Sequence, residues 1–388
     1  MKLAIVTETF PPEINGVAMT FGVIASELGR RGHSVAVYRP SRPDLQDPGI
    51  SSNIRQIPMP GVPIPGYPQL RLGLPVRRRL RRLWSEERPE LVHVATEGPL
   101  GISAIRAALS LGIPVTSSFH TNFHAYASHY GISLFRRAAL GWLRHVHNLT
   151  RRTFVPTSDL CAELSGLGFR NLAVLSRGVD TRQFGPERRS FALRAEWGAA
   201  PGDPVVIHVG RMAAEKNYPL LFRVYAEMRK VNPACRFVLA GEGPLKRALV
   251  RDHPECVFAG FFPRDEIGRY YASADVYIHA SLTETFGNVL TEAMSSGLAV
   301  AAFDYAAARV FVRDGENGLA CPRERPDALV AAGARLAADP ALRNRLRIGG
   351  RAAVETQSWE RVISRFEGDL ESVAGVERSQ AGPAPVLA

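Results

Sequence analysis

Two glutamates in the segment "SLTETFGNVLTEAMSSG" have the type and spacing to bind a ligand. Glu284 lies just before a predicted helix, and Glu292 lies two turns inside it. Gly287 leaves room for a phosphate, and the free N–H groups at the helix start form an anion site. Two carboxylates flanking a diphosphate suit the hydroxyl groups of a nucleotide sugar, while a solvated helix with two surface glutamates is the alternative. The predicted donor-binding residues here are Phe286, Gly287, Asn288, Val289, Leu290 and Glu292.

A second group, "HVGRMAAEKN", follows the predicted strand at 204–210. Arg211 and Lys216 in this loop, after Gly210, can grip a leaving diphosphate. Cations at a helix start oppose the helix dipole, so a bound anion explains them better than solvation does. The chain has no D-x-D motif for a metal-bound diphosphate. We therefore expect no obligatory metal and no other cofactor.

The first half contributes weaker candidates. Asn15 and Gly16 form a turn before a helix, which suits backbone contact with a phosphate. His120 ends a predicted strand and could donate to a sugar hydroxyl, although a structural histidine is the alternative. A metal site of His120 and His124 lacks a third ligand. Residues 241–246 are not a Walker loop and the first turn is not G-x-G-x-x-G, so neither ATP nor NAD is indicated.

Short apolar runs alternate with amphipathic helices, which predicts an α/β protein with two doubly wound, mostly parallel sheets. A chain of 388 residues favours two domains. We place them at 1–180 and 185–355, with a last helix at 357–376 packing back on the first domain and a disordered tail at 380–388. The predicted strands are 2–7, 33–39, 91–95, 114–120 and 152–158, then 204–210, 236–243, 256–260, 275–281 and 298–304.

The bulk composition is that of a globular protein that stays inside the cell. Its four cysteines lie far apart, which argues against a disulfide framework and a zinc site. The apolar run after Met1 ends too early for a signal peptide, and no run could span a membrane.

The net charge of +11 is concentrated in one half, since residues 1–184 hold 22 Lys and Arg against 12 Asp and Glu, and residues 185–388 hold 26 against 25. The segment 71–90 has seven arginines. A helix there could turn Trp84 toward a bilayer and its arginines toward anionic head groups, or simply pack by its leucines on the sheet. No nucleic-acid motif accompanies it, so nucleic acid is not an expected partner. The predicted patch is Arg77, Arg78, Arg79, Arg81, Arg82 and Trp84.

Taken together, the motifs resemble the retaining glycosyltransferases of the GT-B fold that use GDP-mannose or UDP-glucose type donors. The resemblance covers nearly the whole chain through "NGV", "FHTNF", "SRGVDTRQF", "VGRMAAEKN", "AGEGP" and "ETFGNVLTEAMSSGLAV", and is nearest to bacterial glycolipid α-mannosyltransferases. It implies two Rossmann-like domains facing across a cleft. The implied donor contacts are Gly16, Arg211 and Lys216 to the diphosphate, His120 and Glu284 to the sugar, Glu292 to the ribose and the backbone near Phe261 to the base.

The resemblance implies a front-face mechanism in which the leaving diphosphate accepts the acceptor proton. We expect a hexose, mannose from GDP-mannose, to pass to a lipid-linked or glycan acceptor at the inner face of the membrane, with the protein cytoplasmic and peripheral. The alternatives are a UDP-sugar-dependent glucosyl- or sulfoquinovosyl-type transferase, a sugar phosphorylase of the same fold, and a nucleotide-sugar-binding protein without turnover. Asn122 and "YAAA" after Asp304 depart from the family pattern, which leaves the exact donor and acceptor open.

Overall fold

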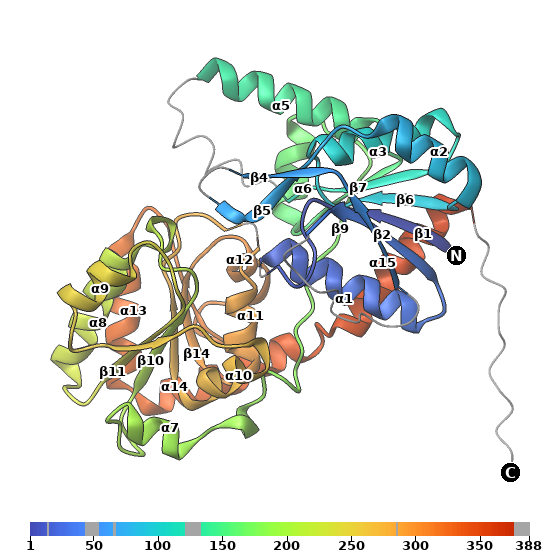
Figure 1. The fold of residues 1–388 in the computed structure, drawn as a ribbon. Helices are drawn as coiled ribbons and strands as arrows, with labels where there is room; N and C mark the ends of the chain where they lie inside the picture. Colours follow the sequence, from blue (N-terminus) through green and yellow to red (C-terminus); the bar gives the residue numbers. More distant parts are fainter. Residues whose placement is uncertain (14, 43–53, 65–66, 121–132, 285, 376–388) are drawn as a thin grey trace, which may run out of the picture. The chain divides into compact units, whose positions relative to one another are not determined.

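The computed structural model describes residues 1–13, 15–42, 54–64, 67–120, 133–284 and 286–375 (Figure 1). His124, Asn122 and the tail at 380–388 lie outside these ranges. The described chain divides into two compact units. The first runs up to Ser176 and includes the chain from Val362 onward, and the second comprises Arg177–Arg361.

The first unit contains a parallel sheet of seven strands in the order β3-β2-β1-β6-β7-β8-β9. A two-stranded antiparallel sheet, β4-β5, accompanies it. The strands of both sheets are β1 (Lys2–Val6), β2 (Ser34–Pro40), β3 (Ile54–Met59), β4 (Gly61–Ile64), β5 (Tyr67–Gly73), β6 (Leu91–Val94), β7 (Val115–Ser118), β8 (Arg152–Val155) and β9 (Leu172–Val174).

Helices cover both faces of the first sheet (Figure 1). In that view α1 and α15 lie below the strands and α2 and α3 lie above them. Phe366 of α15 packs against Phe154, with ring centroids 4.8 Å apart. The helices are α1 (Gly16–Arg30), α2 (Arg77–Glu87), α3 (Pro99–Ser110), α5 (Ser133–Asn148), α6 (Ser158–Gly166) and α15 (Trp359–Ala374).

Helix α2 shows that the predicted membrane contact of Trp84 is wrong. Trp84 and Leu80 are fully buried, and the Trp84 ring meets Tyr38 edge-on with centroids 5.5 Å apart. The apolar stripe of α2 therefore packs on the sheet, as the alternative interpretation held. Only the arginines of the predicted patch are exposed. The burial of Trp84 follows from its i, i+4 spacing to Leu80, which puts both on one helical face.

The second unit contains a parallel sheet of six strands in the order β12-β11-β10-β13-β14-β15. Alternate residues of β10 point to opposite faces, so Val206 joins one core and Val205 and Ile207 join the other. The strands are β10 (Val205–Val209), β11 (Arg236–Ala240), β12 (Val257–Gly260), β13 (Val276–His279), β14 (Ala299–Phe303) and β15 (Leu319–Cys321).

Two layers of helices cover this second sheet. Helices α8 and α13 contribute to the core that contains Val206, and α10 and α11 contribute to the core that contains Ile207. The helices are η1 (Pro186–Arg188), α7 (Phe191–Glu196), η2 (Ala214–Lys216), α8 (Tyr218–Val231), α9 (Lys246–Asp252), α10 (Arg264–Ser273), α11 (Asn288–Ser295), α12 (Ala307–Phe311), α13 (Pro326–Ala338) and α14 (Pro340–Glu355).

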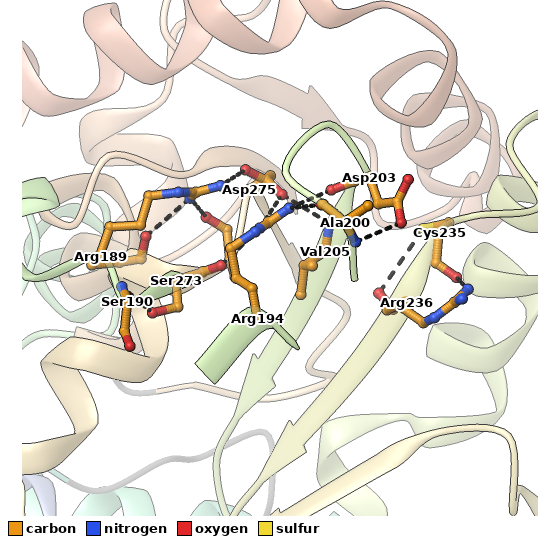
Figure 2. Close-up of polar contacts among 12 residues, drawn as sticks. Arg189, Ser190, Arg194, Ala200, Asp203, Val205, Cys235, Arg236, Ser273 and Asp275 are labelled. Carbon is orange, nitrogen blue, oxygen red and sulfur yellow. Dashed lines mark hydrogen bonds and ion pairs between the residues drawn. The ribbon is translucent and has the colours of Figure 1, made fainter. Parts of the chain in front are cut away.

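A buried ionic network ties the segment before β10 to the amino end of the second sheet (Figure 2). Asp275 accepts hydrogen bonds from Arg189 at 2.8 Å, from Arg194 at 2.9 Å and from the Val205 backbone at 2.9 Å. Arg194 also donates to the carbonyl oxygens of Ser273, Ala200 and Asp203. Burial opposes ionisation of Asp275, but the two arginines lower its pKa below the ordinary value. The network holds the amino ends of β10 and β13, at the opposite end of the sheet from the loops that follow these strands.

The predicted pair of doubly wound sheets is confirmed. All ten predicted strands are present, and the sequence missed the short strands β9 and β15, the polar strand β3 and the β4–β5 pair. In each sheet the strand order reverses at one point, between β1 and β6 in the first and between β10 and β13 in the second. Ligands of doubly wound sheets bind beyond the carboxyl ends of the strands at such a point.

Candidate active site

The loop after β10 carries the two predicted cations. Arg211 is half exposed and forms an ion pair with Glu215, four residues on, at 2.6 Å. Lys216 ends η2, and the next residue, Asn217, adopts a left-handed conformation with φ of 57° that redirects the chain into α8. The lysine side chain points back to the strand ends, since its Cε lies 3.5 Å from where a Cβ of Gly210 would be.

Lys216 pairs with the first of the two predicted glutamates. Its Nζ donates to Oε1 of Glu284, from the loop after β13, and both side chains are mostly buried, with exposed fractions of 15% and 13%. These residues are 68 positions apart in the chain. They meet because β10 and β13 are neighbouring strands whose following loops share one edge of the sheet.

Two buried histidines that the sequence analysis did not single out lie at the same strand ends. His279 Nε2 is 3.4 Å from Glu284 Oε1, and the His208 ring stacks on Tyr277 at 6.2 Å between centroids. Burial lowers the pKa of both histidines to about 3, and the charge of Lys216 adds to the effect. Both rings are therefore neutral at physiological pH. In the sequence, these two histidines could have been recognised as the last polar residue of an otherwise apolar strand.

The loop after β11 supports the loop after β10 through a close backbone approach. A Cβ at Gly241 would lie 1.9 Å from the carbonyl oxygen of Gly210, and Gly241 has a φ of 145°. Met212 N–H donates to the carbonyl oxygen of Glu242 at 2.8 Å. Gly241 of "AGEGP" is thus required by packing, because only glycine allows the two loops to come this close.

The start of α11 partly matches the predicted anion site. Gly287 precedes the helix with φ of 91° and ψ of 59°, and no side chain caps the helix start. The N–H of Leu290 donates to the carbonyl oxygen of Gly287 at 3.0 Å, so it is not one of the free donors that we predicted. Asn288 and Val289 remain half-buried at the helix start. The Phe286 side chain is buried and packs against Phe311 at 6.1 Å, which leaves only its backbone to meet a ligand.

Gly287 has a second reason to be glycine beyond its left-handed φ. A Cβ there would lie 3.3 Å from His279 Cε1 and 3.7 Å from Glu284 Cγ. The space beside its Cα therefore faces these two side chains, and the approach of a phosphate to Gly287 stays a prediction.

The remaining donor-binding candidates of the second unit lie on either side of this centre. Glu292 is half-buried on α11, where its Oε2 accepts a hydrogen bond from the Tyr271 hydroxyl at 3.4 Å. Phe261 follows β12 and is 55% exposed. Phe261 thus follows the carboxyl end of its strand, and Glu292 lies on the helix that begins after β13, while their contact with a ligand stays a prediction.

The candidates of the first unit lie beyond the carboxyl ends of its own strands. Asn15 caps α1, because its Oδ1 accepts a hydrogen bond from Ala18 N–H at 2.9 Å. A Cβ at Gly16 would meet no heavy atom within 4 Å, so packing does not demand glycine there. His120 follows β7 and its ring meets Phe21 edge-on at 5.7 Å.

Two acids that we did not predict lie at the reversal point of the first sheet. Glu8 follows β1 and accepts hydrogen bonds from the N–H groups of Gly73 and Leu100. Glu97 follows β6 and is half-buried, and burial together with the charge of Glu8 raises its pKa to about 7. Glu97 therefore changes its charge within the physiological pH range.

Within the described residues, one group has side chains close enough to hold a metal ion: His33, Glu367 and Glu371 of the first unit. The Glu367 carboxylate already accepts hydrogen bonds from Arg31 at 2.7 Å and from His33 at 2.6 Å. A metal ion would have to displace a guanidinium, so the group serves better as the ionic anchor of α15 on α1.

The chemistry of the second-unit edge is that of anion and hydroxyl recognition. Arg211 and Lys216 can neutralise a diphosphate. Glu284 offers Oε2, which has no hydrogen-bond partner among the residues that the structure describes, to a donor hydroxyl. Lys216 and Glu284 meet at the point where the strand order reverses, and Arg211 follows β10 in the same loop as Lys216.

Comparisons with known proteins agree with this geometry. Residues 14–183 match the family described as Glycosyltransferase Family 4, and residues 190–353 match Glycosyl transferases group 1. The chain is 34% identical to a GDP-mannose-dependent alpha-mannosyltransferase of Mycobacterium tuberculosis, over 98% of this chain and 99% of that protein.

A second protein of Mycobacterium tuberculosis, a GDP-mannose-dependent alpha-(1-6)-phosphatidylinositol dimannoside mannosyltransferase, is 28% identical over 96% of this chain and 97% of its own. Among solved structures, sucrose-phosphate synthase from Thermosynechococcus elongatus superposes with a TM-score of 0.80 at 18% identity, over 97% of this chain and 100% of that one. The structural likeness bears out the predicted GT-B fold class.

Proposed function

Because this chain belongs to the glycosyltransferases, with a Family 4 half followed by a group 1 half, we propose that it transfers mannose from GDP-mannose to a lipid-linked or glycan acceptor. The donor class is supported by the 34% identical relative, whose name specifies GDP-mannose. A lipid-linked acceptor is supported by the phosphatidylinositol dimannoside mannosyltransferase. We assign the donor to the second unit and the acceptor to the first.

The observation that carries the proposal is the pairing of Lys216 with Glu284 beside Arg211. A nucleotide diphosphate-sugar presents an anion joined directly to a hydroxyl-rich ring. The two cations suit the diphosphate, and the open Oε2 of Glu284 suits a hexose hydroxyl. A ligand that consists of phosphate alone would have no hydroxyl to donate to the open Oε2 of Glu284.

The proposed mechanism is a front-face substitution. The acceptor hydroxyl oxygen forms a bond to the anomeric carbon on the side that the diphosphate leaves, and the bond from that carbon to the diphosphate oxygen breaks. The acceptor proton passes to the departing diphosphate oxygen, so the products are the retained glycoside and the nucleoside diphosphate. Arg211 and Lys216 stabilise the charge that develops on the leaving group, and His120 is proposed to contact the donor sugar.

We also propose that the first unit docks on an anionic membrane surface. The α2 arginines, Arg77, Arg78, Arg79, Arg81 and Arg82, are exposed, and each basic residue near such a surface contributes roughly 1 kcal/mol. Trp142 on α5 is 45% exposed and can replace the buried Trp84 as the interfacial aromatic residue. No helix within the described ranges is long and apolar enough to cross a membrane, so docking at the inner face would be peripheral.

The test of function is donor-dependent transfer. Purified protein is incubated with GDP-mannose, UDP-glucose or ADP-glucose and with membrane lipid from bacteria that make mannolipids, and the labelled sugar in the lipid fraction is measured. We expect transfer from GDP-mannose and a loss of about 100-fold or more in Lys216→Ala. Lys230→Ala, at an exposed lysine of α8, is the matched control. Transfer from a UDP-sugar alone would refute the donor assignment, and phosphate-dependent cleavage of a disaccharide would identify a phosphorylase.

A further inference from the structure

His279 lies directly behind the proposed donor-sugar carboxylate. It is the last residue of β13 and is 3% exposed. Its Nε2 is 3.4 Å from Glu284 Oε1, the same oxygen that accepts a hydrogen bond from Lys216 Nζ. Two donors from different elements, η2 and β13, thus hold one carboxylate oxygen and leave the other open.

The His279 ring itself is held in place from several sides. It stacks on Tyr305 with centroids 6.5 Å apart and planes 11° apart. The Tyr305 hydroxyl donates to the carbonyl oxygen of Ser281 at 2.6 Å, and the guanidinium of Arg323 lies 4.4 Å over the Tyr305 ring. Gly287 closes the edge at Cε1. The ring therefore has one well-defined orientation toward Glu284.

The charged groups around His279 determine which of its two ring nitrogens carries the proton. The titratable groups that face His279 are Lys216, Glu284, His208, Tyr277 and Tyr305. Burial, then the charge of Lys216, lowers the pKa of His279 to about 3, so the ring is neutral. A neutral imidazole that faces a carboxylate at Nε2 carries its proton there, because the carboxylate can only accept.

We propose that His279 is a positioning residue of the transfer reaction, donating its Nε2 proton to Glu284 Oε1 so that Oε2 is aimed at a hydroxyl of the donor hexose. The inference rests on the proposed function and assigns a role to a side chain that the motifs did not include. A carboxylate tied only to the flexible ammonium of Lys216 could rotate. The rigid ring removes this freedom and pre-organises the contact.

The test compares two substitutions of nearly equal size. His279→Gln keeps an N–H donor at a similar reach, and His279→Leu removes it. Transfer is measured with the nucleotide sugar that stabilises the wild type most in a thermal-shift screen. We expect kcat to fall about 10- to 100-fold in His279→Leu and less than about threefold in His279→Gln. The Kd for the matching nucleoside diphosphate, which lacks the hexose, should not change.

A double-mutant cycle separates positioning from a structural role. If His279 acts through Glu284, then His279→Leu costs nothing further in the Glu284→Gln background. His253→Leu is the control, since that ring stacks on Phe222 away from the strand ends. Additive losses, a weakened nucleoside diphosphate Kd, or equal losses in both His279 variants would each overturn the proposal.

The positioning role of His279 can still be tested if the protein does not catalyse the proposed reaction. A wild type that transfers no hexose from any donor would refute the function. The cycle can then be measured from the affinity for the nucleotide sugar relative to its diphosphate, which should fall in His279→Leu and recover in His279→Gln. An unchanged ratio would overturn the positioning role by itself.

Discussion

The Lys216–Glu284 ion pair allows stability and catalysis to be separated in one experiment. Lys216→Met removes the cation and leaves a carboxylate that is 13% exposed with His279 as its remaining donor. Breaking a fully buried pair from one side costs 3–5 kcal/mol, and the residual exposure of both groups reduces this to about 2–3 kcal/mol. In a domain of this size the midpoint of thermal unfolding should fall by about 4–12 °C.

Removing both charges should restore part of this stability but none of the activity. Glu284→Gln keeps a shape that can still accept a hydrogen bond, so we expect it to cost only about 1 kcal/mol. In Lys216→Met/Glu284→Gln no buried charge is left unpaired, and the two effects should couple by about 1–2 kcal/mol. Transfer should stay at least about 100-fold below the wild type in each variant that lacks Lys216, because the leaving diphosphate has lost a cation.

The assay is urea and thermal unfolding followed by far-UV circular dichroism, with initial rates of nucleoside diphosphate release measured on the same preparations. Two results would refute the reasoning. If the losses of stability simply add in the double variant, the ion pair does not form in solution. If activity returns when both charges are removed, Lys216 serves the carboxylate rather than the leaving group.

Three further predictions address the scaffold, the loop support and the membrane surface. Asp275→Asn should destabilise the protein by about 3–5 kcal/mol at pH 7, because it leaves two arginines facing a neutral amide. The pKa of Asp275 is lower in the folded protein than its ordinary value of 3.8, so its stabilising contribution is present above pH 3.8 and is lost as the pH falls through the folded pKa. The stability deficit of the variant in urea unfolding should therefore shrink in acid. Gly241→Ala should reduce kcat roughly 100-fold, since its Cβ would push the carbonyl of Gly210 and displace the loop after β10. Trp142→Ala should weaken sedimentation with anionic vesicles roughly 10-fold without loss of stability, whereas Trp84→Ala should cost about 3–5 kcal/mol of unfolding free energy.

Each of these has a matched control. Asp327→Asn removes an aspartate of the same unit that is 83% exposed and should leave stability unchanged. Gly202→Ala adds a Cβ where no heavy atom lies within 4 Å and should leave kcat unchanged. Vesicles of neutral lipid control for the charge of the membrane. Equal binding to neutral and anionic vesicles would contradict a docking surface built from arginines.

The sequence predicted the parts of this protein that depend on local pattern. Short apolar strands alternating with amphipathic helices predicted two doubly wound sheets, and two of the loops after these strands bring Lys216 and Glu284 together. The errors arose where local pattern leaves a choice open. Strand β9 has only three residues, too few for a periodic signal, and the stripe of α2 that includes Trp84 could equally have faced a bilayer or a sheet.

By itself, the sequence determined which residue types follow which strands, and hence that cations, carboxylates and helix starts gather at the edge of one sheet. Only the tertiary structure decided how they meet. Lys216 pairs with Glu284 across 68 positions because β10 and β13 are adjacent. His208 and His279 are neutral because packing removes water from them, which no spacing records. Burial and strand neighbourhood are properties of the folded chain as a whole, so the electrostatics of the site could be read only from the fold.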